Sequence, residues 1–165
     1  MRLIQDEKLE LGEIDIAKIK IDTKSRDDIP QILLGLQYLY TNDETREKLF
    51  ALLEQLIPPK VNRNNGRPGM HLWRIFVLGT LRISLNIDYD RLHSYANESR
   101  TIREMLGHTR SDDTYYHCQT LKDNIKLFTP EMLAEINELV VNAGHKILKK
   151  NHRKRPYALE VIRLS

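Results

Sequence analysis

One stretch of the sequence decides the fold of this chain: GRPGMHLWRIFVLGTLRISLNIDYDRLHSYAN, residues 66–97. Within it, residues 72–85 are apolar at nearly every position and include Trp73, Phe76 and Leu81. A helix that is apolar on all sides has to be surrounded by protein. The sequence therefore predicts a central helix, with shorter and more polar helices packed around it.

Helix-capping residues indicate where the other helices begin. Two acidic helices are expected before the apolar helix, and Pro58 and Pro59 end the second of them. Two short helices are expected after it, followed by a long amphipathic helix over residues 130–150. The candidate caps are Ser25, Asp27 or Asp28, then Thr41 or Asn42, then Asp88 or Asp90, then Ser99, and finally Thr129.

The segment RSDDTYYHCQTLKDNIKLF, residues 110–128, predicts one more short helix. Its cap is expected to be Ser111, Asp112 or Asp113. At helical spacing, one face carries Thr114, Cys118, Leu121, Ile125 and Phe128, and the opposite face displays Tyr116, Gln119, Thr120 and Asp123. That polar face suits hydrogen bonding in a nucleic-acid groove, although most amphipathic helices turn such a face only towards water.

These elements predict an all-α fold: a multi-helix, helix-turn-helix-like domain around a central apolar helix. The expected parts are an extended N-terminal arm at residues 1–24, an acidic helical pair at 25–59, a linker at 60–70, a helical core at 71–150 and a basic tail at 151–165. The arm has no second strand-like segment to pair with, so we expect it to pack on helices.

Composition narrows the function classes. The chain has 165 residues, 41% of them hydrophobic, which suits one compact domain. It shows no apolar run long enough to span a membrane and no signal peptide, so a cytoplasmic, nucleoid-associated protein is expected. Residues 1–57 hold 8 Lys and Arg against 12 Asp and Glu, whereas the remainder holds 18 against 11. Basic side chains concentrated in one part of a chain favour a nucleic-acid partner.

Catalytic and metal-binding patterns are weak. A set formed by His108, Asp112, Asp113 and His117 is conceivable, because Asp113 and His117 would share a helical face. Acidic residues just before a helix are, however, expected as caps alone. The single cysteine, Cys118, is expected to be a small buried hydrophobic residue. No phosphate-binding loop is present, and no small-molecule ligand is expected.

Three stretches resemble the N-terminal region of bacterial insertion-sequence transposases. They are SRDDIPQILLGLQYLYTNDETREKLFALLEQLIP at 25–58, GRPGMHLWRIFVLGTLRISLNIDYDRLHSYANESRTIREMLG at 66–107 and DDTYYHCQTLKDNI at 112–125. The similarity is greatest to the ISNCY group of DDE transposases, which carry an InsH-type N-terminal domain. The resemblance implies an all-helical domain that binds double-stranded DNA at the terminal inverted repeats of the element.

In that family a ribonuclease-H-like domain follows, where three acidic residues hold divalent metal for strand cleavage. Residues 151–165 would begin that domain, and Glu160 does not match its first acidic residue convincingly. We therefore expect a transposase truncated before its catalytic domain, with no cofactor and no enzymatic activity of its own.

The expected DNA contacts divide into two kinds. Phosphates would be contacted by Arg63, Arg67, Arg100, Arg103, Arg110, Lys122, Lys149, Lys150, Arg153 and Lys154, and base edges by Tyr116, Gln119 and Thr120. A homo-oligomer is compatible with this interpretation. Two other classes stay open: a helical protein-interaction or dimerisation module, including a transposition inhibitor, and an intact metal-dependent nuclease.

Overall fold

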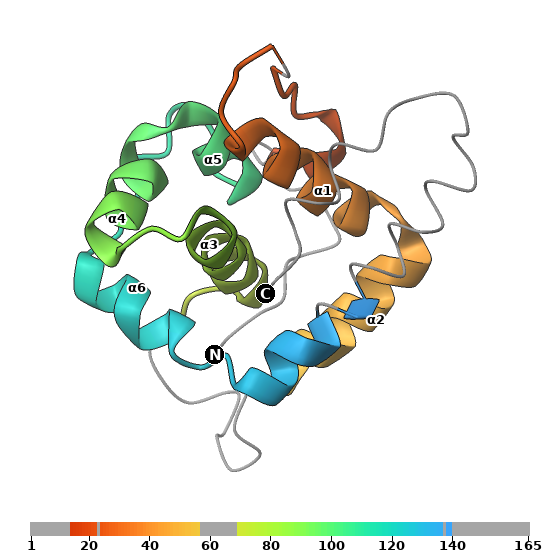
Figure 1. Ribbon diagram of the computed structural model, residues 1–165. Coiled ribbons are helices and arrows are strands. Elements are labelled where there is room, and N and C mark those ends of the chain that lie inside the picture. Colours follow the sequence, from red (N-terminus) through yellow and green to blue (C-terminus); the bar gives the residue numbers. More distant parts are fainter. Residues whose placement is uncertain (1–13, 23, 57–68, 137, 140–165) are drawn as a thin grey trace.

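The apolar segment forms helix α3 (Leu72–Leu85), and the other helices surround it (Figure 1). In this computed structural model the described residues are 14–22, 24–56, 69–136 and 138–139. The side chains of Trp73, Ile75 and Leu78 are completely buried. The prediction of a central apolar helix is confirmed.

The regular structure in the described residues is entirely helical, which confirms the all-α fold class. A short 3-10 helix, η1 (Ile16–Lys18), precedes the α-helices. The α-helices besides α3 are α1 (Ile29–Thr41), α2 (Asp43–Glu54), α4 (Tyr89–Glu98), α5 (Arg100–Met105) and α6 (Cys118–Ile125). Residues 130–136 and 138–139 are also helical. The predicted tail and most of the predicted linker lie outside the described residues.

Most helices begin at the predicted caps. Asp28, the N-cap of α1, makes no side-chain cap bond. At four other predicted starts the cap side chain accepts a hydrogen bond from a backbone N–H in the first helical turn, as expected for an N-cap. These pairs are Asn42 with Thr45 at 3.1 Å, Asp88 with Arg91 at 2.8 Å, Ser99 with Ile102 at 3.4 Å and Thr129 with Met132 at 3.2 Å. Gly107, at φ 89°, follows the end of α5 in the left-handed conformation that glycine adopts without strain.

The described part of the predicted arm, residues 14–22, packs on α1, but η1 interrupts its extended course. Ile16 and Ile19 are buried in the core. The side-chain amide of Gln37 in α1 donates hydrogen bonds to the backbone carbonyls of Ile16 (2.9 Å) and Ile19 (3.0 Å). One amide group therefore holds the arm against α1 and also bonds the carbonyls at both ends of η1.

Helix α6 is packed on α3 through a close contact. A Cβ atom at Gly79 would lie 2.8 Å from Cε2 of Phe128, which follows α6 in the chain. Real Cβ atoms do not approach so closely, and glycine leaves the space that the Phe128 ring fills. Leu121 and Ile125 on the inner face of α6 are buried, as their spacing predicts.

The predicted start of α6 is wrong. The helix begins at Cys118 with His117 as its N-cap, and residues 112–117 have no regular secondary structure. Thr114 is consequently exposed instead of facing the core, and Cys118 is half-buried with its Sγ 3.7 Å from Oδ1 of Asp90. The cause is the Asp112 side chain, which binds within the loop before the helix instead of capping the helix.

Candidate nucleic-acid interface

The loop before α6, residues 106–117, is organised by one buried histidine. His108 is 1% exposed, with Nδ1 2.6 Å from Oδ2 of Asp112 and Nε2 hydrogen-bonded to the hydroxyl of Tyr116. Burial lowers the pKa of His108, so the imidazole is neutral. A carboxylate only accepts hydrogen bonds, which assigns the proton to Nδ1 and makes Nε2 the acceptor for the Tyr116 hydroxyl.

The two partners of His108 have the protonation states that this arrangement requires. Burial raises the pKa of Tyr116, so its phenol keeps the proton that it donates. Burial alone would also raise the pKa of Asp112, but hydrogen bonds from Thr114 and His108 outweigh it and hold that pKa well below its usual range. The result is a chain from hydroxyl to imidazole to carboxylate in which every donor has an acceptor.

Arg103 and Asn97 hold the backbone of the same loop. The Arg103 guanidinium donates to the carbonyls of Thr114 (2.9 Å) and Asp112 (2.9 Å). The Asn97 amide donates to the carbonyl of Tyr116 (3.0 Å) and accepts from its N–H (2.8 Å). These side chains take the place of the backbone partners that a helix or sheet would provide.

Helix α3 anchors the start of the loop. Nε1 of Trp73 donates to the carbonyl of Met105 at 2.9 Å, and Nε of Arg74 donates to the carbonyl of Leu106 at 2.9 Å. Carbonyls at the end of a helix have no partner within the helix. Both contacts therefore stabilise the end of α5 and tie the loop to the central helix.

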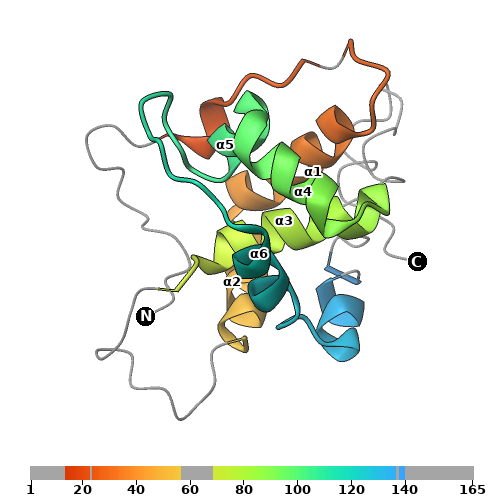
Figure 2. The same cartoon turned by 90° about the vertical axis from the view of Figure 1, so that its left-hand side faces the viewer.

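Beyond this loop, α6 lies alongside α4 (Figures 1 and 2). The two segments run antiparallel, because residues later in one contact residues earlier in the other. The contacting pairs are Tyr116 with Asn97, Tyr115 with His93, Cys118 with Asp90 and Lys122 with Tyr89. The outer surface of this pair, here called the α4–α6 face, is formed by His93, Tyr115, His117, Gln119, Thr120 and Lys122. Gln119 and Thr120 are exposed in the first turn of α6.

Tyr115 gives this face an unusual aromatic surface. It is 56% exposed, although its hydroxyl is 2.9 Å from Nε2 of His93. Its ring meets those of His93 and His117 edge to face, at centroid distances of 5.4 and 5.2 Å. Surface tyrosines usually turn the hydroxyl to water. Here the hydroxyl is bound to protein, and the ring itself contributes to the surface.

The predicted DNA contacts are distributed unevenly. Gln119, Thr120 and Lys122 lie on the α4–α6 face. The prediction that Tyr116 belongs to an exposed face is wrong, because it is 5% exposed and bonded to His108. Arg103 is bound to the loop, which places it poorly for a phosphate contact. Six predicted contacts lie outside the described residues: Arg63, Arg67, Lys149, Lys150, Arg153 and Lys154.

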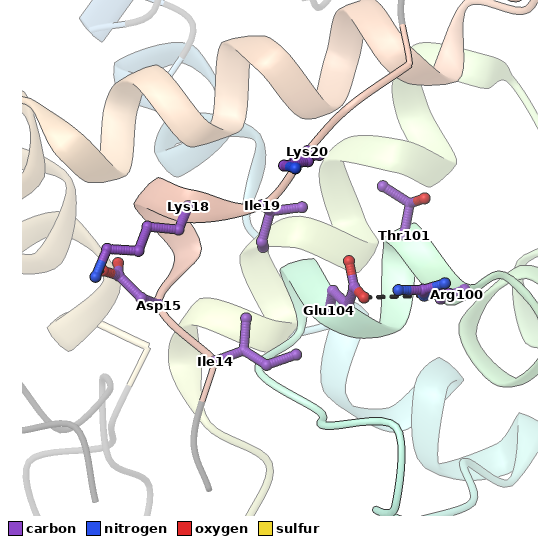
Figure 3. A pocket seen from close by; sticks show the side chains of 8 residues that line it. All are labelled: Ile14, Asp15, Lys18, Ile19, Lys20, Arg100, Thr101 and Glu104. Carbon is purple, nitrogen blue, oxygen red and sulfur yellow. Dashed lines mark hydrogen bonds and ion pairs between the residues drawn. The ribbon is translucent and has the colours of Figure 1, made fainter.

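Arg100 and Arg110 line recesses beside α5, away from the first turn of α6. A recess of about 690 Å³ lies between the arm and α5 (Figure 3). Its two carboxylates are both paired, Glu104 with Arg100 at 3.1 Å and Asp15 with Lys18 at 3.3 Å. A smaller recess of about 240 Å³ includes Arg110, which is exposed. Because its acidic groups already neutralise two cations, the larger recess is a weaker phosphate site than its basic residues suggest.

The structure separates the four residues that we weighed as a metal or catalytic set. His108 and Asp112 are bonded to each other, whereas Asp113 and His117 are exposed and do not share a helical turn. Among the described residues, no group of three or more His, Cys, Asp or Glu side chains is arranged to hold a metal ion. Within the same residues, no helix is long and apolar enough to cross a membrane.

Comparison with known proteins gives no further indication, since no protein-family model, curated protein or solved structure matches this chain. The sequence assigns no binding role to His93 and Asn97 on α4 or to Tyr115 in the loop. Their partners are 19 to 22 positions away in the sequence, and no short-range pattern marks such pairs.

Proposed function

We propose that this chain binds double-stranded DNA with sequence preference, as the N-terminal DNA-binding domain of a transposase that engages terminal inverted repeats. Helix α6 acts as the recognition helix and α4 as its support, in a helix-turn-helix-like arrangement. One observation carries the proposal: α6 exposes Gln119 and Thr120 in its first turn, while a buried hydrogen-bond network fixes the loop that precedes it.

The dimensions and chemistry of α6 suit a major groove. Eight residues give a helix about 12 Å long, comparable with the groove width of about 12 Å. Recognition helices read base edges with residues near their N-termini. A glutamine amide pairs with N6 and N7 of adenine, and a threonine hydroxyl both donates and accepts. Oδ1 of Asp123 accepts from Nε2 of Gln119 at 2.8 Å and orients that amide.

Charges around the α4–α6 face are mixed. Lys126 is exposed one turn after Lys122 on α6, but Asp90 of α4 and Asp123 of α6 are exposed as well. Each phosphate contact steepens the salt dependence of binding. The described residues of this face therefore support a small number of phosphate contacts, with base-edge contacts supplying the preference.

The test begins with selection of duplexes from a random-sequence library by the purified chain. Affinities for the enriched duplex and a scrambled one are then measured by fluorescence anisotropy. Gln119→Ala is expected to lower the preference for the enriched duplex about tenfold, the loss of one base contact. Gln55→Ala, which removes an exposed glutamine at the end of α2, is the matched control and is expected to keep the preference.

The proposal is of binding without cleavage, so the duplex is expected to stay intact with magnesium or manganese. Metal-dependent nicking by the pure protein would contradict this and favour the nuclease. If no duplex is enriched even at low salt, and the chain self-associates in sedimentation without DNA, the proposal is wrong. A helical interaction module would then be the better interpretation.

A further inference from the structure

Two cations from different helices share one aromatic ring on the flank of α6. Cζ of Arg82, in the last turn of α3, lies 4.3 Å from the ring centroid of Tyr89, the first residue of α4. Nζ of Lys122 in α6 lies 5.9 Å from the same centroid. The ring thus holds together two positive charges that would otherwise repel each other.

Neither cation has an ion-pair partner among the described residues. The Nε of Arg82 is also buried there without a hydrogen-bond acceptor. Leaving a buried donor unsatisfied is costly. This corner of the molecule therefore carries positive charge that no ion pair neutralises in the described residues, while the Nε of Arg82 itself is shielded from solvent and from an external anion.

The carboxylates nearest in sequence are bound elsewhere. Asp88 caps α4 by accepting from the backbone N–H of Arg91 at 2.8 Å. Asp90 faces the Sγ of Cys118 at 3.7 Å. Asp123, directly after Lys122, accepts from Nε2 of Gln119 at 2.8 Å. All three carboxylates lower the local positive potential, but none forms an ion pair with Arg82 or Lys122 in the described residues. An anion supplied from outside the chain would complete the cluster.

We propose that Arg82, Tyr89 and Lys122 form a clamp for backbone phosphates of the DNA strand beside the groove that α6 enters. This inference rests on the proposed function and assigns Arg82 and Tyr89 a part in it. A guanidinium stacked on an aromatic ring keeps its N–H groups in the plane, directed away from the ring, where they match phosphate oxygens. Lys122 adds a point charge at the same place.

The position of the clamp on α6 fits this role. Residues three apart on a helix are surface neighbours, so Lys122 lies next to Gln119, the candidate base-reading residue. Phosphate contacts set the position of a protein on the duplex without reading its sequence. The clamp would hold α6 in register, while Gln119 and Thr120 read the bases.

The experiment measures affinity against salt concentration for the full chain on the enriched and scrambled duplexes. Arg82→Gln and Lys122→Gln are each expected to weaken binding to both duplexes equally, about tenfold at low salt. Each is also expected to flatten the slope of log K against log[salt] by about 0.9, the loss of one phosphate contact. Arg26→Gln removes an exposed charge before α1, and it is expected to change neither the affinity nor the salt slope.

The ring is tested separately. Tyr89→Phe keeps the aromatic face and is expected to bind as the wild type does, whereas Tyr89→Leu is expected to bind two- to five-fold more weakly. Circular dichroism checks that each variant is folded. If Arg82→Gln unfolds, Lys122→Gln, whose side chain is only half-buried, decides the question.

The outcomes separate this inference from the proposed function. If the wild type enriches a sequence but Arg82→Gln and Lys122→Gln keep its salt slope, only the clamp is wrong. Loss on the enriched duplex alone would also overturn the clamp, since phosphate contacts do not discriminate. If the wild type binds no duplex, both proposals fail together.

Discussion

The α1–α2 pair and the loop at residues 106–117 are stabilised in opposite ways. Leu36, Leu49 and Leu53 of the helical pair are completely buried, and the core of the pair is apolar apart from Thr45. The loop is held by His108, whose side chain is bonded at both nitrogens, together with the amide and guanidinium groups of α4 and α5. The helical pair is stabilised by the burial of apolar surface, and the loop is stabilised by directional hydrogen bonds.

The difference shows how precisely each kind of interaction determines the local conformation. Burial of leucines is non-directional, and a helix packed in this way tolerates small shifts. A buried polar network specifies one conformation, because an unpaired group in a low-dielectric interior is costly. The loop immediately precedes α6, so its network sets where the first turn of that helix lies. The most precisely determined conformation in this comparison therefore lies beside the proposed recognition surface.

The largest effects are expected from truncating one residue in each region. Leu53→Ala in α2 leaves a cavity and is expected to lower the free energy of unfolding by about 3 kcal/mol. His108→Ala leaves the Asp112 carboxylate and the Tyr116 hydroxyl without their buried partner, and a similar loss of about 3 kcal/mol is expected. Urea unfolding followed by circular dichroism measures both.

DNA binding distinguishes the two variants under conditions where each is still folded. Leu53→Ala is expected to keep wild-type preference for the enriched duplex, because α2 is not part of the α4–α6 face. His108→Ala is expected to lose much of that preference through disorder of the loop. Equal preference in both variants would show that the network stabilises the fold without positioning α6.

A smaller effect on the free energy of unfolding is expected from a change of pH. It arises from His108 in the loop and not from the helical pair. Burial lowers the pKa of His108 below its usual 6.5, so the unfolded chain binds a proton that the folded chain does not. The free energy of unfolding should therefore fall as pH falls below 6.5, by up to about 1.4 kcal/mol per pH unit. Asp112 titrates below its usual 3.8 and lies outside this window.

The measurement compares unfolding of the wild type and of His108→Gln between pH 7.5 and 5.5. The variant is expected to show a shallower dependence on pH, and the difference isolates His108 from the other histidines. His117→Gln, which removes an exposed imidazole, is the matched control. A variant slope equal to that of the wild type would contradict a neutral, buried His108 in the folded protein.

The same contrast explains which parts of the structure the sequence predicts. The bounds of α3 follow from its apolar composition, and Asn42, Asp88, Ser99 and Thr129 mark helix starts because capping is a local interaction. Leu121 and Ile125 were placed in the core by helical spacing alone. Interactions between residues within one or two helical turns can be recognised from the spacing of residue types in the sequence.

The loop could not be predicted in this way. Asp112 and Asp113 look like caps, but Oδ1 of Asp112 accepts from the backbone N–H of Thr114 at 2.9 Å while Oδ2 meets His108. That choice depends on the buried imidazole and on Arg103, which bridges the backbone of the loop from α5. Tyr116 was assigned to the wrong face for the same reason. Its direction is set by partners distant in the sequence.

The smallest expected effects compare two helix starts that look alike in the sequence. Oδ1 of Asn42 accepts from the N–H of Thr45 at the start of α2, whereas Asp28 makes no side-chain cap bond to α1. Asn42→Ala is expected to cost about 1 kcal/mol, and Asp28→Ala only about 0.3 kcal/mol, the interaction of its charge with the helix dipole. Unfolding in high salt sharpens the comparison, because screening removes the Asp28 effect and leaves the Asn42 hydrogen bond. Equal losses that both persist in salt would mean that the Asp28 side chain also caps α1 by a hydrogen bond, and would contradict the difference between the two helix starts.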